Sequence, residues 1–308
     1  MKILHFSDLH LDTPFASSYM PVKLAQGCRL RLRRTLLKLL DLAVEYEVDA
    51  VTIAGDLFEG NQVSRDTIRF LMDSFAQIAP IPVLIAPGNH DYYSPVSPYA
   101  RLDWPGNVFI FSSNQLQPFH LTGEIVVWGM AHTQPNQTDN PLQGFHASQE
   151  GKRHIVLMHA SETEFRSEAH AQYAPFQTRD IVAAGLDFAL LGHYHGARLL
   201  TLEKTVGAYP GSPQPLNFGE QGDHGAILLN LQNNQFQCQL IPTATQAFVH
   251  LNFNPENFSD THSLAEAIIE AVPAKAAEAN FLRVNLTGIQ PIALNLQFDL
   301  LREHLGQC

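Results

Sequence analysis

The chain carries the segment AVTIAGDLFEG at residues 50–60. Its apolar half, residues 50–54, is too short for a helix and is followed by glycine, a pattern typical of a buried parallel strand. The strand is predicted to end at Gly55, which places Asp56 at its carboxyl end. Open α/β sheets bind their ligands at this edge, and a carboxylate with two free oxygens can bridge two cations. Glycine and a polar residue also end many strands without any chemistry, so this interpretation depends on the other turns of the chain.

The first apolar run of the chain, Lys2–Phe6, leads into Asp8 and His10. Their spacing of two residues places both side chains on the same side of an extended segment. A carboxylate and an imidazole that point together can chelate a borderline cation such as Mn, Fe or Zn. The alternative is a turn acid beside a surface histidine.

Amphipathic helices are predicted over residues 30–47 and 64–79, with Ser64 as the N-cap of the second. They alternate with the strands and therefore indicate parallel βαβ units. The third strand, residues 81–86, also runs into a polar turn, which contains Asn89, His90 and Asp91. Three successive units thus end in turns with metal-competent side chains, which ordinary strand ends do not explain.

The second half of the chain repeats the pattern. The strand predicted at residues 155–158 ends at His159. The strand at residues 187–191 runs into a turn that contains His193 and His195. Glycines flank that turn and allow the backbone to approach bound metals closely. A single His-x-His turn also has a purely structural interpretation, but this one is the fifth strand end with candidate ligands.

The stretch between these halves begins with predicted strands at residues 108–111 and 125–128. Residues 131–153 that follow are polar, lack a helical or strand period and predict a long surface loop that borders the substrate cleft. His132 and His146 lie in or near this loop without a strand-end setting, so we interpret both as solvated.

The last third of the chain predicts strands at residues 198–202, 225–231 and 236–241, which would build a second sheet packed against the first. A boundary near residues 242–245 gives a catalytic domain over residues 1–242 and a small domain over residues 243–308. The small domain predicts a β-α-β unit, with strands at residues 248–253 and 281–286 around a helix at 264–271, and a final helix at 296–305.

The composition is that of an ordinary globular protein, with 308 residues and 45% hydrophobic content, enough to bury a full core. The N-terminus has too few apolar residues before its first acid for a signal peptide, and no stretch reaches membrane-spanning length. We therefore expect a cytoplasmic protein without a membrane partner. Cys28, Cys238 and Cys308 are far apart and lack metal-ligand spacing, which argues against a disulfide framework and a thiolate metal site.

The formal net charge is −11, which argues against binding of nucleic acid through charge attraction alone. The densest basic cluster falls in the first predicted helix and consists of Arg29, Arg31, Arg33, Arg34 and Lys38. This cluster permits contacts with backbone phosphates, and a solvated helix face is the alternative interpretation.

The strand-end turns, taken in chain order, resemble the signature of the calcineurin-like metallophosphoesterases: Asp8-x-His10, Gly55-Asp56, Gly88-Asn89-His90-Asp91, His159 and Gly192-His193-x-His195. The resemblance implies an α/β fold, a four-layer α/β/β/α sandwich, followed here by a small C-terminal α+β capping-like domain. It also implies two divalent metal ions, with Mn first and Fe, Zn or Mg as alternatives. One ion would bind Asp8, His10, Asp56 and His195. The other would bind Asp56, Asn89, His159 and His193.

Longer motifs resemble the bacterial SbcD and YhaO-type branch of DNA repair nucleases. They are HFSDLHLDTPF at residues 5–15, AGDLFEG at 54–60, LLGHYHG at 190–196, YPGSPQPLNFGE at 209–220 and FLRVNLTG at 281–288. The resemblance implies single- or double-stranded DNA as the substrate and admits a homodimer. Glu59 occupies a position where archaeal and eukaryotic relatives often carry a histidine and bacterial members an acid. Relatives usually continue past the point of Cys308 into a segment that docks an SbcC-like ATPase, so that partnership stays open.

The mechanism that the resemblance implies is in-line attack on phosphorus by a hydroxide shared between two cations that Asp56 bridges. His90 lies beside the ligands and would protonate the leaving oxygen, with Asp91 holding its ring. Cleavage of DNA phosphodiesters is the leading hypothesis, and hydrolysis of a small nucleotide or phosphoester is the alternative that the acidic charge favours. A scaffold with an inactive site is disfavoured because no ligand is missing from the signature.

Overall fold

The computed structural model describes residues 1–15, 20–60, 62–147, 151–164, 172–233, 235–272, 279–289 and 294–306. The chain divides into two compact units. The first unit comprises Met1–Gln214 and Gly222–Ala244, and the second comprises Pro215–Gln221 and Thr245–Cys308. The first unit contains two six-stranded sheets and the second contains a two-stranded sheet, and each unit has its own hydrophobic core.

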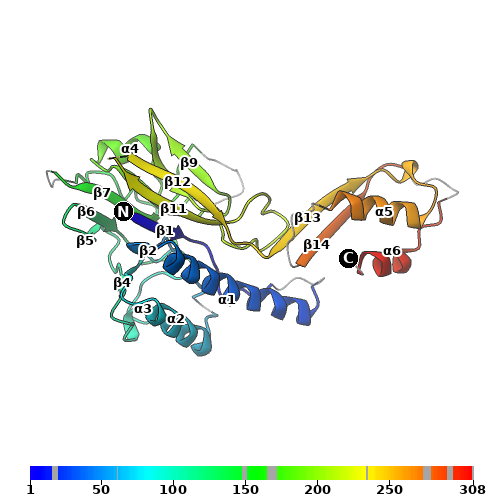
Figure 1. The fold of residues 1–308 in the computed structure, drawn as a ribbon, viewed down its shortest axis with the longest axis horizontal. Helices are drawn as coiled ribbons and strands as arrows, with labels where there is room; N and C mark the ends of the chain where they lie inside the picture. The colour runs from blue at the N-terminus through cyan, green and yellow to red at the C-terminus, as the bar shows by residue number, and fades with distance from the viewer. Residues whose placement is uncertain are drawn as a thin grey trace. The chain divides into compact units, whose positions relative to one another are not determined.

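One sheet of the first unit has the strand order β12-β11-β1-β2-β3-β4 (Figure 1). Its strands are β1 (Lys2–Phe6), β2 (Ala50–Ile53), β3 (Val83–Ile85), β4 (Val108–Ile110), β11 (Gly225–Gln232) and β12 (Gln235–Pro242). Strands β1 to β4 are parallel, as the alternation of strands and helices predicts, and β11 and β12 are antiparallel. The prediction that residues 225–231 and 236–241 belong to a separate sheet is wrong. The buried, apolar first half of β11 suits an interior position beside β1, where Leu229 lies opposite Ile3.

The other sheet has the strand order β5-β6-β7-β8-β10-β9. Its strands are β5 (Gln117–His120), β6 (Ile125–Gly129), β7 (Arg153–His159), β8 (Phe188–Gly192), β9 (Arg198–Thr201) and β10 (Thr205–Tyr209). Strands β6, β7, β8 and β10 run parallel, and β5 and β9 are antiparallel edge strands. The sequence pattern does not predict β10, because glycine interrupts its short run TVGAY.

The helices of this unit are α1 (Val22–Glu45), α2 (Arg65–Gln77), α3 (Pro98–Arg101) and α4 (Thr178–Ala183). Helices α1 and α2 lie along the outer face of the first sheet (Figure 1). Helix α1 begins well before residue 30, because Ala25 and Cys28 extend its buried stripe toward the N-terminus. Ser64 caps α2 as predicted, since its side chain accepts a hydrogen bond from the Thr67 N–H at 3.1 Å.

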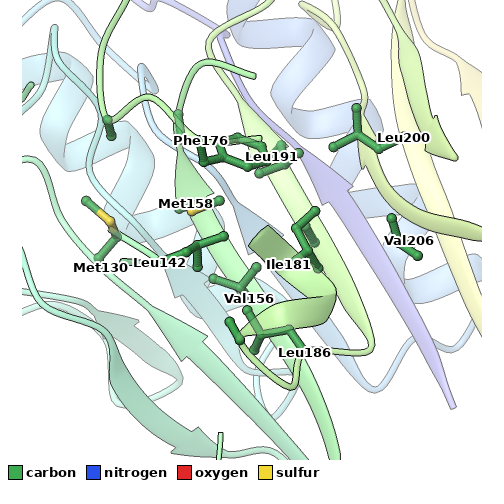
Figure 2. Close-up of a cluster of buried hydrophobic side chains, with 14 of the residues drawn as sticks. Met130, Leu142, Val156, Met158, Phe176, Ile181, Leu186, Leu191, Leu200 and Val206 are labelled. Atoms are coloured by element: carbon green, nitrogen blue, oxygen red, sulfur yellow. The ribbon is translucent and has the colours of Figure 1, made fainter. Parts of the chain in front are cut away.

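The side chains of β7 alternate between two cores, as expected for a strand covered on both faces. Ile155 and Leu157 point into the core between the two sheets. Val156 and Met158 point to the opposite face, where they pack with Ile181 of α4 (Figure 2). With α1 and α2 on the first sheet and α4 on the second, the unit is the four-layer α/β/β/α sandwich that was predicted.

We expect Leu190→Ala to destabilise the protein by about 2–5 kcal/mol, because it opens a cavity between the two sheets. The side chain of Leu190 is fully buried in the core shared by both sheets. Urea unfolding followed by circular dichroism measures the change. Leu30→Ala on α1, at a side chain that is 57% exposed, is the matched control and should change stability by less than about 0.5 kcal/mol.

The second unit contains a parallel pair of strands, β13 (Gln246–Phe253) and β14 (Ala279–Leu286), with Phe248 opposite Phe281. Between and after them lie the short helix η1 (Pro255–Asn257), α5 (Thr261–Ala271) and α6 (Phe298–Leu305). Helices α5 and α6 share a small core with one face of the strand pair. These elements reproduce the predicted β-α-β unit and final helix.

Cys28 and Cys238 are free thiols, as predicted, and Cys308 lies outside the described residues. Within the described part of the chain, no helix combines the length and the apolar character that crossing a membrane would require.

Candidate metal centre

The predicted ligands lie at strand ends of both sheets. In the first sheet, Asp8 and His10 follow β1, Asp56 follows β2, and Asn89 follows β3. In the second sheet, the predicted ligands are the last residue of β7 and two residues after β8, namely His159, His193 and His195. The Nδ1 atom of His159 lies 2.8 Å from the carbonyl oxygen of Ala54, so a hydrogen bond joins the two sheets at this edge.

Side-chain donor atoms converge here from segments far apart in the sequence. Three groups each have ligand atoms within 4.8 Å of one another: Asp8, His10 and His195; His10, Asp56 and His90; and Asp8, Asp56 and His159. Asn89 joins them through its Oδ1 atom, 2.9 Å from His159 Nε2. The His193 ring centroid lies 5.3 Å from that of His159, and its backbone N–H donates to the Asp8 carboxylate at 3.1 Å. The structure thus brings all the predicted ligands to one place.

The unprotonated nitrogen of the His159 ring faces oxygen atoms that also carry lone pairs. The Ala54 carbonyl can only accept, so Nδ1 of His159 must donate and Nε2 is unprotonated in the neutral ring. Burial holds the pKa of His159 well below its ordinary value, which favours the neutral ring. The Nε2 atom faces Asn89 Oδ1 at 2.9 Å and Asp56 Oδ2 at 3.4 Å. Oxygen and nitrogen lone pairs converge there, which is the environment that a cation requires.

His10 is arranged in the same way. Its Nδ1 atom lies 2.8 Å from Glu59 Oε1, and an ionised carboxylate can only accept. Its Nε2 atom faces His195 Nε2 at 3.3 Å and Asp56 Oδ2 at 3.7 Å. A carboxylate that holds the far nitrogen of an imidazole is the usual support of a metal-binding histidine.

The backbone around Asp56 is strained and closely packed. Asp8, His10 and Asp56 have φ angles of 54°, 49° and 51°, in the left-handed region that side chains rarely adopt. Such strain costs on the order of 1–3 kcal/mol per residue and is concentrated at functional sites. A Cβ atom on Gly88 would lie 2.3 Å from Asp56 Oδ1, so this turn requires glycine.

The sequence predicts an Asp56 carboxylate with two free oxygens. In the structure, one of the two is already engaged in a hydrogen bond. The Oδ1 atom of Asp56 accepts the His90 backbone N–H at 2.9 Å. Its Oδ2 atom faces the Nε2 atoms of His159, His10 and His90 at 3.4, 3.7 and 4.0 Å. A single oxygen of Asp56 therefore lies between imidazoles contributed by both sheets.

Residues 1–197 match the sequence family described as calcineurin-like phosphoesterase. The chain belongs to this family. It is 30% identical over 246 residues to the uncharacterized metallophosphoesterase YhaO of Bacillus subtilis, an alignment that covers 78% of this chain and 59% of that protein. It is 26% identical over 214 residues to the DNA double-strand break repair protein Mre11 of Sulfurisphaera tokodaii, covering 66% of this chain and 51% of that protein. The matches thus span between half and three fifths of the length of these relatives.

Calcineurin-like phosphoesterases are hydrolases that bind divalent metals, and the donor set in this chain fits such ions. Carboxylate oxygens, an amide oxygen and neutral imidazoles suit borderline divalent cations. Both candidate ligands with a defined tautomer, His10 and His159, have their Nε2 atoms directed at Asp56 Oδ2. The prediction of divalent metal binding is therefore consistent with the local chemistry of this site.

The prediction that Asp91 holds the ring of His90 in this phosphoesterase is wrong. Asp91 is buried and accepts backbone N–H bonds from Gly88, Leu57 and Asp56 at 2.7, 2.8 and 3.0 Å. Its carboxylate therefore ties together the turns after β2 and β3. Burial, followed by the charge of Asp56, raises the pKa of Asp91 to about 6 against the effect of these hydrogen bonds.

Glu59 holds the ring of His90 instead. The Glu59 Oε2 atom lies 2.8 Å from His90 Nδ1, while its other oxygen binds His10. The hydrogen bond to Glu59 raises the pKa of His90 to about 9, against the opposing effect of burial. Burial would raise the pKa of Glu59, but its bonds to both rings outweigh this effect and hold that pKa well below its ordinary value.

We expect Tyr99→Phe to lower the free energy of unfolding by about 1.5–3 kcal/mol, the usual contribution of a hydrogen bond to a charged group. The Tyr99 hydroxyl donates to Asp91 Oδ2 at 2.8 Å, and both side chains are buried. Chemical denaturation measures the loss. Tyr92→Phe, at a half-buried neighbouring position, is the control, and an equal effect of the two variants would contradict this account.

His132 is a site residue that the sequence analysis misplaced in solvent. Its side chain is fully buried, and its Nε2 atom lies 2.6 Å from the His159 carbonyl oxygen. Its ring packs edge-on against the His159 ring at 5.5 Å between centroids. The sequence signal that could have identified His132 is its position just after β6. The carboxyl end of β6 neighbours that of β7, which ends at His159. His146 is exposed, as predicted.

Proposed function

We propose that this chain is a metal-dependent phosphodiesterase that cleaves DNA. The observation that carries the proposal is the Asp56 Oδ2 atom, which lies 3.4 to 4.0 Å from the Nε2 atoms of three histidines contributed by both sheets. A carboxylate oxygen beside the Nε2 lone pairs of His10 and His159 is suited to two adjacent cations, which is the arrangement that many phosphodiesterases use.

The ligands divide into two sets that share Asp56. One ion would be held by Asp8, His10, Asp56 and His195. The other would be held by Asp56, Asn89, His159 and His193. When bound, two such cations lower the pKa of a water molecule and neutralise charge on the phosphoryl oxygens. Glu59 and the Ala54 carbonyl hold the rings of His10 and His159 with their Nε2 atoms toward Asp56 Oδ2, where the ions would bind.

His90 is proposed to donate a proton to the leaving oxygen. Its side chain is 44% exposed, so a substrate can reach it, whereas the side chains of His10 and Asp56 are 4% exposed. Its Nδ1 atom is held by Glu59 at 2.8 Å, and its Nε2 atom, 4.0 Å from Asp56 Oδ2, is left to donate the proton. A proton donor in this position contributes roughly 10² to 10⁴ in rate.

A DNA substrate is supported by the relative named as a DNA double-strand break repair protein and by the motifs that resemble SbcD-type nucleases. A small nucleotide or phosphoester is the alternative, because the net charge is −11. The basic cluster on α1 also supports the alternative, since several of its side chains have intramolecular partners. Arg33 binds Asp66 at 2.7 Å, and Lys38 lies 3.4 Å from the Thr243 carbonyl oxygen.

The test is hydrolysis by purified, Mn-loaded protein of end-labelled duplex and single-stranded DNA, beside bis-p-nitrophenyl phosphate. Degradation of DNA that is lost in His90→Ala supports the nuclease, and the fragment ladder gives its polarity. Cleavage of the small diester without cleavage of DNA supports the alternative substrate class. Failure of all three substrates with Mn, Fe, Zn and Mg would contradict the proposed phosphodiesterase.

A further inference from the structure

Glu59 is an acidic side chain that binds the Nδ1 atoms of both a candidate metal ligand, His10, and the candidate proton donor, His90. Its Oε1 atom binds His10 Nδ1 at 2.8 Å, and its Oε2 atom binds His90 Nδ1 at 2.8 Å. The two rings meet edge-on with their centroids 4.8 Å apart. One carboxylate therefore spans two imidazoles with different proposed tasks.

The backbone holds this carboxylate between the two histidine segments. The Glu59 N–H donates to the Leu11 carbonyl at 3.0 Å, one residue from His10. The next N–H, of Gly60, donates to the His90 carbonyl at 3.0 Å. A Cβ atom on Gly60 would lie 2.5 Å from that oxygen, so the close approach requires glycine. Both partners are thus anchored to the segment that carries Glu59.

A carboxylate in this position determines which nitrogens carry protons. Because an ionised carboxylate only accepts, the Nδ1 atoms of His10 and His90 must both donate to Glu59. Their Nε2 atoms then both face Asp56 Oδ2, at 3.7 and 4.0 Å. Rotation or a change of tautomer in either ring would break a hydrogen bond to the shared carboxylate.

We propose that Glu59 is a positioning residue that couples the metal ligand His10 to the proton donor His90. This inference rests on the proposed function. The coupling means that one substitution disturbs both metal affinity and protonation of the leaving group. It also means that the chain depends on Glu59 most for substrates whose leaving group is an alkoxide, as in DNA.

Glu59→Gln is the sharpest variant, because glutamine has the same shape but offers one acceptor and one donor group. It can accept from one ring, and its amide opposes the Nδ1–H of the other. We expect Mn²⁺ affinity in calorimetry to fall about 10- to 100-fold, the usual cost of losing support behind a metal ligand. We also expect loss of one of the two Nδ1–H signals of His10 and His90 in the histidine nitrogen spectrum of the metal-free protein, because only one ring keeps an acceptor. Glu203→Gln, at an exposed position, is the matched control for both measurements.

Activity measurements on two diesters distinguish the proposed coupling from a general structural role of Glu59. Thymidylyl-thymidine needs a protonated leaving oxygen, whereas bis-p-nitrophenyl phosphate releases a stable phenolate. Glu59→Gln should lower cleavage of the first about 10²-fold or more beyond its effect on the second. The double variant with His90→Ala should be no more selective than His90→Ala alone, because both changes remove the same proton transfer.

The experiments test the coupling through Glu59 and the proposed phosphodiesterase function separately. Unchanged metal affinity, unchanged selectivity or unchanged Nδ1–H signals in Glu59→Gln would each overturn the coupling. Wild-type protein that cleaves neither diester would contradict the proposed function, while the nitrogen spectra and calorimetry would still decide whether Glu59 holds both rings.

Discussion

Asp56→Asn is expected to lower cleavage of bis-p-nitrophenyl phosphate by more than about 100-fold and to abolish binding of the second metal ion. The effect should exceed the 10- to 100-fold loss that is usual for groups behind the ligands, because Asp56 is itself proposed to contact both ions. Mn²⁺ stoichiometry by calorimetry, together with steady-state hydrolysis, measures it. Asp41→Asn on the exposed face of α1 is the matched control.

The orientation of the new amide can be derived from the hydrogen bonds around Asp56. The His90 N–H lies 2.9 Å from Oδ1 and requires an acceptor there, so the asparagine oxygen takes that position. The amide nitrogen then replaces Oδ2 and donates toward the Nε2 lone pairs of His159 and His10. The amide N–H groups would therefore occupy the lone pairs that bind cations in the wild type.

Stability should change in a characteristic way in this variant. In chelator, Asp56→Asn should be at least as stable as the wild type, because the converging acceptors now have a donor. With Mn²⁺ at about 100 times the dissociation constant, the wild type should gain about 2.7 kcal/mol and the variant much less. A variant that is stabilised by Mn²⁺ as strongly as the wild type would show that Asp56 is not a ligand.

Strand ends were the predictable part of the site. Parallel neighbours place their carboxyl ends at one edge, so apolar runs followed by Asp56 and Asn89 were sufficient to predict that these side chains meet. The same reasoning applied to His159, which completes β7. Which two sheets would face each other at this edge was supplied only by the family resemblance.

Side-chain directions within the turns were not predictable from spacing. Asp8 and His10 were expected to converge because they lie two apart in an extended segment, but both have left-handed φ angles of 54° and 49°. Their convergence has a different cause, the hydrogen bonds of this turn to the turn after β2. Hydrogen bonds between turns also determine two other side-chain directions. Asp91 points inward to backbone donors, and Glu59, remote in sequence from His90, reaches the ring of His90.

His90→Ala is expected to lower turnover of DNA or a dinucleotide by roughly 10² to 10⁴ while both metal ions still bind. His90 contributes its N–H to Asp56 Oδ1 through the backbone, which alanine retains, so the bridging carboxylate keeps its position. The ring is the most exposed of those around Asp56 Oδ2, with 44% exposure against 4% for His10 and 0% for His159. This exposure to solvent fits a proton donor, which a substrate has to reach, better than a ligand.

The competing assignment makes His90 a metal ligand, since its Nε2 atom belongs to one of the groups of converging donors. The two roles predict different results for one variant. A lost ligand lowers Mn²⁺ affinity and slows every substrate, whereas a lost proton donor slows alcohol leaving groups and largely spares p-nitrophenolate. If His90→Ala lost metal and turnover together, with no dependence on the leaving group, the role of proton donor would have to be abandoned, and with it the coupling through Glu59.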